Sequence, residues 1–281
     1  MKSSNSLLGI AGAILMSMTY TSCTTDTNEP NQFAITETTL NQFKDLGFDV
    51  SDIQVDQSVN PLTGIKEKMY VLEGDIAITE ENLLQMVRSE IAHEGACGEQ
   101  YRTTNLVGGL PRTIRVMGYT GGSQALDSKM RTALQWAVDN YNALNTGLNF
   151  TLTFGTNYSS YDMVVYKVSG AGGGSAGFPS GGNPYKFIQI QAGTSNYDTN
   201  VVEHVITHEM GHCLGLRHTD YFNRSLSCGS GGNEGSSGVG AIHIPGTPTG
   251  FDANSIMLAC FSSSEDGEFG SFDRTALEYL Y

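Results

Sequence analysis

The segment His208–His218 constrains this chain more than any other, because it places three histidines and a glutamate within eleven positions. Its first two histidines lie four residues apart, so on a helix of about 3.6 residues per turn both imidazoles project from one face. Gly215 is the residue type that ends a helix in a left-handed conformation, after which the chain turns back and brings the third histidine to the same ion. Three neutral imidazoles on Zn²⁺ leave a fourth position for water, as in catalytic zinc sites. The predicted ligands of one Zn²⁺ are His208, His212 and His218, with Glu209 beside them as the general base.

A second motif follows downstream, where Ser255-Ile256-Met257 supplies a methionine at the place of a Met-turn. Together the two motifs resemble the signature of metzincin endopeptidases. Within that clan, the run from His208 to Tyr221, with Cys228, Gly240–Pro248 and the Met257 turn, is similar to the bacterial dual-action HEIGH metallopeptidases. Met210 stands where the family name has an isoleucine. The resemblance covers approximately the last two-thirds of the chain.

The resemblance implies both a fold and a reaction. The fold is α+β, a zincin-like catalytic domain with a twisted mixed sheet, a long helix and a zinc helix, in which Met257 lies beneath the metal. The reaction is hydrolysis of protein or peptide substrates, in which Zn²⁺ lowers the pKa of water and Glu209 carries the proton to the leaving amine. Astacin-like relatives place a tyrosine two residues after the methionine. That position is Ala259 here, so help for the transition state is expected from elsewhere or from zinc alone.

Two interpretations without catalysis stay open from the sequence. One is a non-catalytic zinc-containing surface lipoprotein that keeps the fold and binds peptide or glycan. The other is a zinc-dependent binding module without turnover. Degenerate enzymes usually lose the base or a ligand first, and Glu209 and all three histidines are present, which favours the enzyme.

Composition narrows the partners. The chain has 281 residues, 39% of them hydrophobic, so it can bury a core with room for a catalytic domain and a smaller segment. Its formal net charge of −14 disfavours nucleic acid and anionic membranes as partners. We expect a monomer that meets a membrane only through a lipid anchor.

The N-terminus has the pattern of an export signal. Lys2 precedes the apolar run Leu7–Met18, which is too short to span a bilayer but suits the hydrophobic region of a signal peptide. The run ends in Thr21-Ser22-Cys23, which resembles a bacterial lipoprotein cleavage site with Cys23 as the lipidated residue. We therefore expect an outer-membrane or cell-surface lipoprotein, or otherwise a secreted protein. The predicted boundaries are a lipoprotein-type signal peptide over residues 1–23, a linker and prosegment over 24–100, and the catalytic domain over 101–281.

Four cysteines remain after Cys23, an even number in an oxidising compartment. We favour a bridge between Cys228 and Cys260, since both follow the zinc helix, but the sequence leaves all three pairings open. Cys213 neighbours a ligand yet points about 100° away around the helix, so it is expected to pack or to form a bridge rather than to bind zinc. The four candidates are Cys97, Cys213, Cys228 and Cys260.

Residues 33–100 contain few glycines and predict a small α/β unit of helix, strand and helix. The unit is either an accessory domain or a prosegment that fills the cleft until a cut, for which Arg102, Arg112 and Arg115 are candidate sites, removes it. Its predicted elements are a helix with the apolar stripe Leu40, Phe43 and Leu46, a strand at Met69–Thr79, and a helix at Glu80–Ile91 behind Thr79 as its cap.

Within this unit, Leu72-Glu73-Gly74-Asp75-Ile76 resembles the Phe-x-Gly-Asp motif of astacin prosegments, with leucine in place of phenylalanine. The resemblance implies that Asp75 binds zinc in place of water and keeps the precursor silent. Gly74 would allow the backbone to approach the cleft closely. Two alternatives stay open, namely that Gly74-Asp75 is an ordinary turn, or that the thiolate of Cys97 is the latency ligand.

From Thr113 onward the pattern predicts the sheet and the long helix of the catalytic domain. Lys186–Gln191 alternates polar and apolar residues, and in related enzymes the equivalent strand is an edge to which a substrate adds as a further strand. Other strands are predicted at Thr113–Tyr119, Asn149–Phe154 and Tyr161–Val168, the long helix at Met130–Leu144, a C-terminal helix from Ser271, and the substrate-binding strand at Phe187, Ile188, Gln189 and Ile190.

The remaining histidines and acidic residues receive lesser roles. His204 lies one turn before His208, but no helix brings three successive turns to one tetrahedral ion, so we exclude it as a ligand. His93 and His243 are expected to be structural or peripheral. Asn200 and Glu203 are expected to cap the zinc helix, whose buried side carries Val202, Ile206 and Met210. Ca²⁺ is a second candidate ion, in and around an irregular loop at Ser225–Gly240, through Asp220, Asn233, Glu234 and Asp252.

Overall fold

The computed structural model describes residues 35–57, 59–90, 100–234, 241–248 and 250–281. The predicted signal peptide with Cys23, and also His93 and Cys97, lie outside these residues. No helix in the described ranges is long and apolar enough to cross a membrane.

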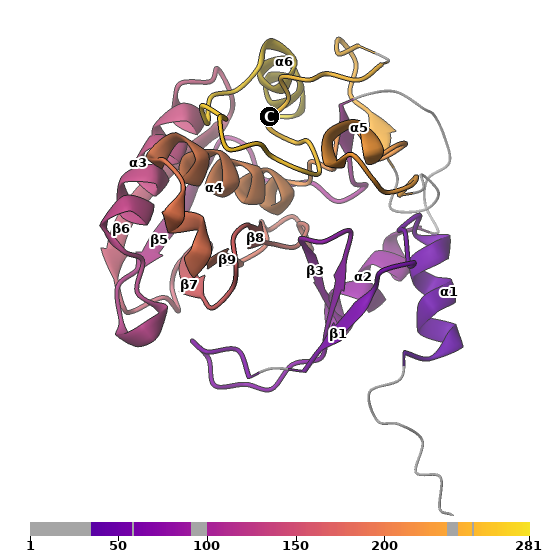
Figure 1. Ribbon diagram of the computed structural model, residues 1–281, viewed down its shortest axis with the longest axis horizontal. Helices are drawn as coiled ribbons and strands as arrows, with labels where there is room; N and C mark the ends of the chain where they lie inside the picture. The colour runs from indigo at the N-terminus through magenta and orange to yellow at the C-terminus, as the bar shows by residue number, and fades with distance from the viewer. Residues whose placement is uncertain (1–34, 58, 91–99, 235–240, 249) are drawn as a thin grey trace, which may run out of the picture. The chain divides into compact units, whose positions relative to one another are not determined.

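The N-terminal region, residues 35–90, is a three-stranded antiparallel sheet accompanied by two helices (Figure 1). The first helix begins after Thr36, whose hydroxyl accepts a hydrogen bond from the Thr39 amide, and it buries Phe43. The second helix begins after Thr79, whose hydroxyl accepts from the Asn82 amide, so the predicted cap is confirmed. The elements are α1 (Glu37–Asp45), β1 (Gln54–Asp56), β2 (Met69–Leu72), β3 (Ile76–Thr79) and α2 (Glu80–Glu90).

The single strand predicted at Met69–Thr79 is wrong, because the chain folds there into a β2–β3 hairpin. Its turn is Glu73-Gly74-Asp75, with φ of +56° at Glu73 and +96° at Gly74. Two successive left-handed residues reverse the chain, and periodicity alone did not reveal them because the apolar alternation continues through the turn. Asp75 therefore lies at the tip of a hairpin rather than within a strand.

The larger region, residues 100–281, contains a five-stranded mixed sheet in the order β6-β5-β7-β9-β8. The first four strands in this order are mutually parallel and β8 is antiparallel to β9, so the prediction of a mixed sheet is confirmed. The strands are β5 (Arg112–Tyr119), β6 (Leu148–Gly155), β7 (Met163–Val168), β8 (Gly174–Ser175) and β9 (Phe187–Gln191), and a separate ribbon pairs β4 (Tyr101–Arg102) with β10 (Ile242–His243).

The predicted edge position of Lys186–Gln191 is wrong, because β9 lies between β7 and β8. The glycine-rich loop before β9 folds back and contributes the two-residue strand that covers Gln189 and Ile190. The next residue, Ala176, pairs with the N-terminal hairpin, since the Ala77 amide donates to the Ala176 carbonyl at 2.7 Å. The N-terminal strand β3 thus lies at the edge of the sheet where a further strand adds (Figure 1).

Two helices pack against each other and against this sheet: α3 (Ser128–Asn142) and α4 (Thr199–Leu214). The buried side predicted for α4 is confirmed, because Val202, Ile206 and Met210 are all fully buried. The predicted capping pair is wrong. Asp198 occupies the N-cap without a side-chain hydrogen bond, and the Glu203 carboxylate instead accepts from the Asn140 side chain of α3.

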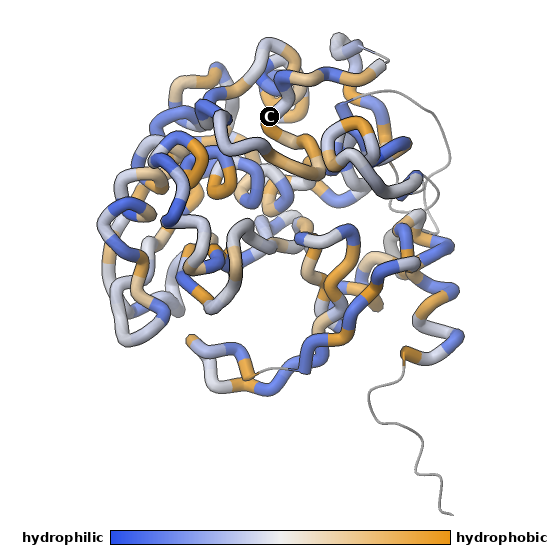
Figure 2. Tube along the Cα trace, in the orientation of Figure 1, coloured by the Kyte–Doolittle hydropathy of each residue, from blue (hydrophilic) through white to orange (hydrophobic). Residues whose placement is uncertain are grey.

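Hydrophobic residues gather in two principal cores, and Figure 2 shows the apolar stretches of the chain along both regions. The larger core contains only residues from Val107 to Leu277. The smaller core belongs to the N-terminal region, except that Phe178 from the glycine-rich loop stacks on Phe48 at 6.2 Å between ring centroids. The larger region therefore packs its sheet and helices around a core to which residues 35–90 contribute no side chain.

The elements that follow α4 in the chain complete the larger region. A short helix, α5 (Ser225–Cys228), forms where we predicted an irregular loop, and α6 (Ser271–Leu280) confirms the predicted C-terminal helix. Cys228 and Cys260 form a disulfide, so the favoured pairing is confirmed. Cys213 is buried and makes no disulfide with a described residue.

Candidate metal centre

The end of α4 brings the three predicted ligands together. His208 and His212 lie on one face of the helix, which ends at Gly215 with φ of +102°. The Gly215 amide donates to the His212 carbonyl, and the chain then reverses. The Arg217 amide donates to the Tyr101 carbonyl at 2.8 Å, which fixes the returning strand. This reversal places His218 opposite the helix, as the spacing predicted.

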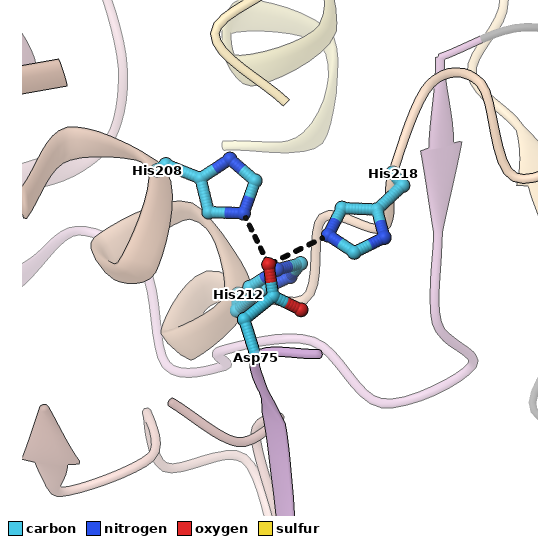
Figure 3. Close-up of side chains that lie close together, drawn as sticks. All are labelled: Asp75, His208, His212 and His218. Carbon is cyan, nitrogen blue, oxygen red and sulfur yellow. Dashed lines mark hydrogen bonds and ion pairs between the residues drawn. The ribbon is translucent and has the colours of Figure 1, made fainter. Parts of the chain in front are cut away.

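Four side chains converge at this point: Asp75, His208, His212 and His218 (Figure 3). One potential ligand atom from each lies within 4.8 Å of all the others. The Oδ2 atom of Asp75 is 3.3 Å from Nε2 of His208 and 3.2 Å from Nε2 of His218. Three imidazoles and a carboxylate around one point form a donor set that suits a small divalent cation such as Zn²⁺.

The other ring nitrogen of each histidine is already bonded, which fixes how the imidazoles face. Nδ1 of His208 lies 2.9 Å from the Ile256 carbonyl, and Nδ1 of His212 lies 2.8 Å from the Leu216 carbonyl. Both carbonyls accept the Nδ1 proton, so each Nε2 keeps a lone pair. Nε2 of His212 is buried and has no hydrogen-bond partner among the described residues. A bound metal ion would satisfy that atom, so the residues present fit the predicted ion.

His218 is supported by a carboxylate instead, because its Nδ1 lies 2.9 Å from Oε1 of Glu234. Burial lowers the pKa of His218, but the carboxylates of Asp75 and Glu234 outweigh it and hold that pKa well above the usual value. Burial also raises the pKa of Asp75, yet the neighbouring imidazoles of His218 and His208 bring it well below its usual value. His218 and Asp75 therefore stabilise each other's charged forms.

Glu209 is only 2% exposed and projects from α4 against β8. A Cβ atom on Gly174 would lie 2.6 Å from Oε1 of Glu209, so the strand passes directly over this carboxylate. Burial raises the pKa of Glu209 well above its usual value, and the nearby charge of Asp75 adds to the effect. Its Oε2 atom has no hydrogen-bond partner in the described part of the chain. A buried carboxylate with a raised pKa can accept and release a proton.

Met257 is fully buried beneath α4. A Cβ atom on Gly211 would lie 2.5 Å from the Met257 sulfur, so only glycine allows the helix to pass this closely. The Met257 carbonyl accepts from the Thr219 amide at 2.8 Å, next to the third histidine. The predicted Met-turn therefore packs against the helix between its two ligands and is tied to the loop that carries the third.

Asp273 is a supporting residue that the sequence did not reveal. Its fully buried carboxylate accepts from the Ser255 hydroxyl, the Ile256 amide and the Gln100 side chain, at 2.8 to 2.9 Å. Because the Ile256 carbonyl faces Nδ1 of His208, the C-terminal helix orients a ligand through the turn. A helical aspartate near the chain end gave no sequence signal, since acidic residues are ordinary in a first helical turn.

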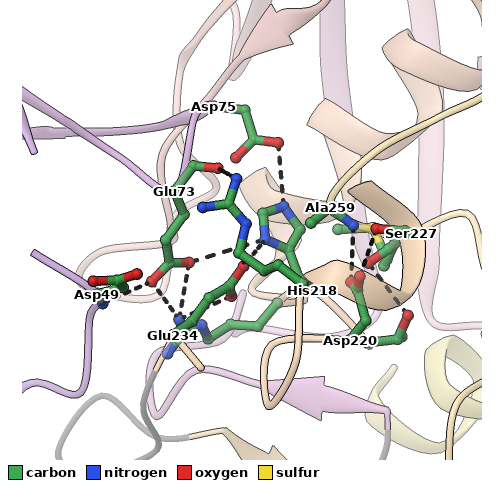
Figure 4. A network of polar contacts seen from close by, with 12 residues as sticks. Asp49, Glu73, Asp75, His218, Asp220, Ser227, Glu234 and Ala259 are labelled. Carbon is green, nitrogen blue, oxygen red and sulfur yellow. Dashed lines mark hydrogen bonds and ion pairs between the residues drawn. The ribbon is translucent and has the colours of Figure 1, made fainter. Parts of the chain in front are cut away.

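Asp220 and Asp252 belong to no cluster of three or more potential metal-binding His, Cys, Asp or Glu side chains in the described residues, so Ca²⁺ stays a prediction. Glu234 faces His218, as given above. Asp220 accepts from the Ala259 amide and the Ser227 hydroxyl and so fixes the segment after the Met-turn (Figure 4). Two of the acidic residues considered for Ca²⁺, Glu234 and Asp220, thus bond groups next to the metal centre.

A second acidic residue of the N-terminal hairpin, Glu73, enters the centre beside Asp75 (Figure 4). Both carboxylate oxygens of Glu73 lie within 3.0 Å of Nη2 of Arg217, and both residues are almost fully buried. The sequence alone predicted no role for the side chain of either residue. Their separation of 144 positions left no local pattern to detect.

A cavity of about 220 Å³ adjoins the histidines and Glu209. Its lining includes His204, Gln191 and the segment Leu258–Phe261 after the Met-turn. His204 is 4% exposed and is not among the four clustered side chains, in line with its exclusion as a ligand. His243 lies elsewhere, with Nε2 3.2 Å from the Thr247 carbonyl. This cavity therefore lies directly beside the candidate metal centre.

Comparison with known proteins agrees with this geometry. A family model described as dual-action HEIGH metallo-peptidase matches residues 69–281, so the match includes the hairpin that carries Asp75. No curated protein matches the chain. Two solved structures of myroilysin resemble it at a TM-score of 0.40: one at 13% identity covers 63% of this chain and 82% of its own, and the other at 16% identity covers 69% and 95%.

Proposed function

This chain belongs to the dual-action HEIGH metallopeptidase family, and from that premise we propose that it is a zinc-dependent endopeptidase of the metzincin type, made as a latent precursor. The family match makes it a metallopeptidase that acts on peptide or protein substrates. The observation that carries the finer proposal is the convergence of His208, His212 and His218 beside the buried carboxylate of Glu209.

His208, His212 and His218 would hold the ion through Nε2. A zinc ion there supplies Lewis acidity toward water and the substrate carbonyl. Glu209 accepts the proton of the attacking water and passes it to the leaving amine, so that the carboxylate is regenerated and the peptide bond is broken. Met257 donates nothing to the metal and keeps the ligand-bearing elements packed.

Substrate would add to the free edge of the sheet by main-chain hydrogen bonds. We assigned this role to Phe187, Ile188, Gln189 and Ile190, but β8 covers part of that strand. The available edge is therefore β8 with Ala176, next to Glu209. The residues Phe187–Ile190 then support the substrate strand from one position further inside the sheet.

Latency is proposed to depend on Asp75. Two observations support this role: its carboxylate lies 3.2 to 3.3 Å from two of the proposed ligands, and its own carbonyl accepts from the Ala176 amide at 3.1 Å. The hairpin thus lies across both the metal centre and the strand edge. Removal of the residues N-terminal to about Tyr101 would expose both the metal centre and the strand edge.

We also propose export of the protein, with residues 1–23 as signal peptide and Cys23 as the lipidated residue, or secretion if the leader is simply cut. The domain boundaries at residues 23 and 100 and a monomeric state belong to the same proposal. The disulfide between Cys228 and Cys260 is compatible with an oxidising compartment.

The test combines metal analysis with a cleavage assay on the full chain cut by limited proteolysis. We expect one zinc per chain, cleavage of a general protein substrate, loss of cleavage on chelation and its return with zinc. Zinc at full occupancy without any cleavage would favour a binding module instead. Cleavage that resists complete removal of metal would contradict the proposed chemistry.

A further inference from the structure

Arg217 is the largest fully buried side chain of the described residues, and it directly precedes the ligand His218. Its Nη2 atom lies 2.9 and 3.0 Å from the two oxygens of Glu73 and 3.5 Å from Oε2 of Glu234. The guanidinium also lies over the Phe48 ring, 4.9 Å from its centroid. A buried guanidinium is tolerated only with such compensation, so these groups together keep Arg217 in place.

Most of this compensation comes from the N-terminal region. Glu73 and Phe48 belong to residues 35–90, whereas Glu234 belongs to the larger region. Arg224 also faces this centre, with Nε 3.4 Å from Oε1 of Glu234 and Nη2 donating to the Glu73 carbonyl. Without the N-terminal region, two guanidinium groups face the single carboxylate of Glu234. The local charge then becomes positive, and the side of Arg217 that Glu73 covers is free.

The guanidinium is also not saturated in the uncut chain. Its Nε and Nη1 atoms are buried and have no hydrogen-bond partner among the described residues, because one nitrogen bonds both oxygens of Glu73. A carboxylate that approaches the planar group in register can bond two nitrogens at once. A different acidic side chain can therefore bind Arg217 at least as well as Glu73 does.

Glu73 reaches Arg217 from a position that lies close to the reacting centre. It is two residues before Asp75, and its Oε2 atom is 3.9 Å from Nδ1 of His218. Its φ of +56° is unfavourable for a residue with a side chain, and such a conformation persists only where surrounding contacts hold it. The ion pair with Arg217 and the hydrogen bond from Arg224 to the Glu73 carbonyl both hold it.

We propose that Arg217 forms a carboxylate-binding subsite of the peptidase, which Glu73 fills in the uncut chain and an aspartate or glutamate of the substrate fills after the N-terminal region is removed. This inference rests on the proposed function. The subsite lies beside His218, so the acidic residue would stand within about two residues of the cleaved bond, the separation of Glu73 from Asp75 along the chain.

The first test profiles cleavage sites in a mixed peptide library with the zinc-loaded chain cut by limited proteolysis. Aspartate and glutamate should be enriched at one fixed position near the cut. Matched peptides with glutamate or glutamine there should differ by roughly tenfold or more in kcat/KM, as expected for a charge-assisted hydrogen bond. Cleavage without such enrichment overturns the inference and leaves the peptidase intact. No cleavage by the zinc-loaded cut chain overturns the proposed function and the inference with it.

The second test changes the enzyme. Arg217→Gln alone would leave Glu73 buried without its partner, so it is combined with Glu73→Gln in the full chain. Glu73 leaves with the N-terminal region, and the cut product then differs from wild type only at Arg217. For the Arg217 variant, the ratio of kcat/KM between the glutamate peptide and the glutamine peptide should fall toward one. Arg131→Gln removes the same charge from an exposed position of α3 and should keep the wild-type ratio. An unchanged ratio in the Arg217 variant would overturn the inference.

A third measurement needs only the wild-type enzyme, in case the variant fails to fold. A synthetic peptide of residues 69–79 should inhibit the cut chain, and the same peptide with Glu73→Gln should inhibit roughly tenfold more weakly. Both peptides keep Asp75, so the difference reports on the carboxylate of Glu73, whose shortest contacts are with Arg217. Equal inhibition by the two peptides would contradict the proposed subsite.

Discussion

The two principal hydrophobic cores of the described residues contact the metal centre in different ways. The larger core includes Met210 and Met257, so apolar packing and backbone carbonyls position the histidines from within. The smaller core contacts the ligands through Phe178 of the glycine-rich loop, whose ring packs edge-on against His212 at 5.5 Å between centroids, and the N-terminal region itself reaches them through the turn Glu73-Gly74-Asp75. Packing of the first kind persists after a cut in the chain, whereas ionic contacts of the second kind leave with the segment that makes them. The comparison separates residues that build the centre from residues that, in the proposed latent precursor, block it.

The largest expected effect on activity comes from a residue of the group that builds the centre. Glu209→Ala should reduce proteolysis by 10²- to 10⁴-fold or more, because a general base is lost while the ligands are untouched, roughly the range for such groups. Zinc content and thermal unfolding should match wild type. Activity that stays within tenfold of wild type would refute the assigned role.

The next largest effect is expected from a substitution in the packing beneath the ligands. Met257→Ala should lower the free energy of unfolding by about 2–5 kcal/mol, since it leaves a cavity against Gly211 in the larger core. Met86→Ala is the matched deletion in the smaller core. It should loosen the N-terminal region and raise the activity of the uncut chain, which Met257→Ala should not do. Denaturant unfolding and zinc analysis measure both. A stable Met257 variant that lacks zinc would show that packing is the wrong explanation.

On the blocking side, Asp75→Ala in the uncut chain should raise basal activity or speed self-cleavage by roughly tenfold or more, equivalent to about 1.4 kcal/mol of lost inhibition. Cys97→Ala serves as the comparison, because Cys97 was the alternative latency ligand, and it should change little. Activity of the two uncut variants on a protein substrate decides between them. Activation by the cysteine variant alone would assign latency to Cys97.

A smaller effect of pH on stability is expected from Glu203 of α4, whose carboxylate accepts from Asn140 of α3. Burial raises its pKa to about 7, and the nearby charge of Glu268 adds to the shift. The folded state therefore binds this proton more tightly than the unfolded state, so the contribution of Glu203 to stability is fully present below pH 4.5 and is lost as pH rises through about 7. The loss should be on the order of 1 kcal/mol after allowance for solvent screening. Glu203→Gln should remove it, as thermal unfolding at pH 5 and pH 8 would show. An equal pH dependence in the variant would place its source elsewhere.

A feature of this fold could be predicted from the sequence when its signal lies within a few neighbouring residues. The sequence predicted the ligand spacing, the glycine that ends α4 and the family. Each of these depends on residues within one turn or one motif. The hairpin at Glu73 and the interior position of β9 were missed, since each depends on a segment that folds back from elsewhere. Asp273 and the Glu73–Arg217 pair were missed for the same reason, because their partners lie far away in the sequence.

The calcium prediction rested on a less specific signal. Acidic residues in loops were considered only by composition, whereas Glu234 faces His218 and Asp220 accepts from the Ala259 amide and the Ser227 hydroxyl. Asp75 shows the reverse case. A short motif of five residues placed it correctly beside the histidines, although the strand in which we expected it does not exist there.

The most direct test of the difference between the two regions is the rate at which one zinc-loaded preparation cleaves a general protein substrate before and after limited proteolysis between residues 90 and 101. The full chain should carry one zinc and be nearly silent, and the cut chain should keep its zinc and become active. A full chain that is already as active as its cut product, at equal zinc content, would contradict the account that the N-terminal region blocks a centre built by the rest of the molecule.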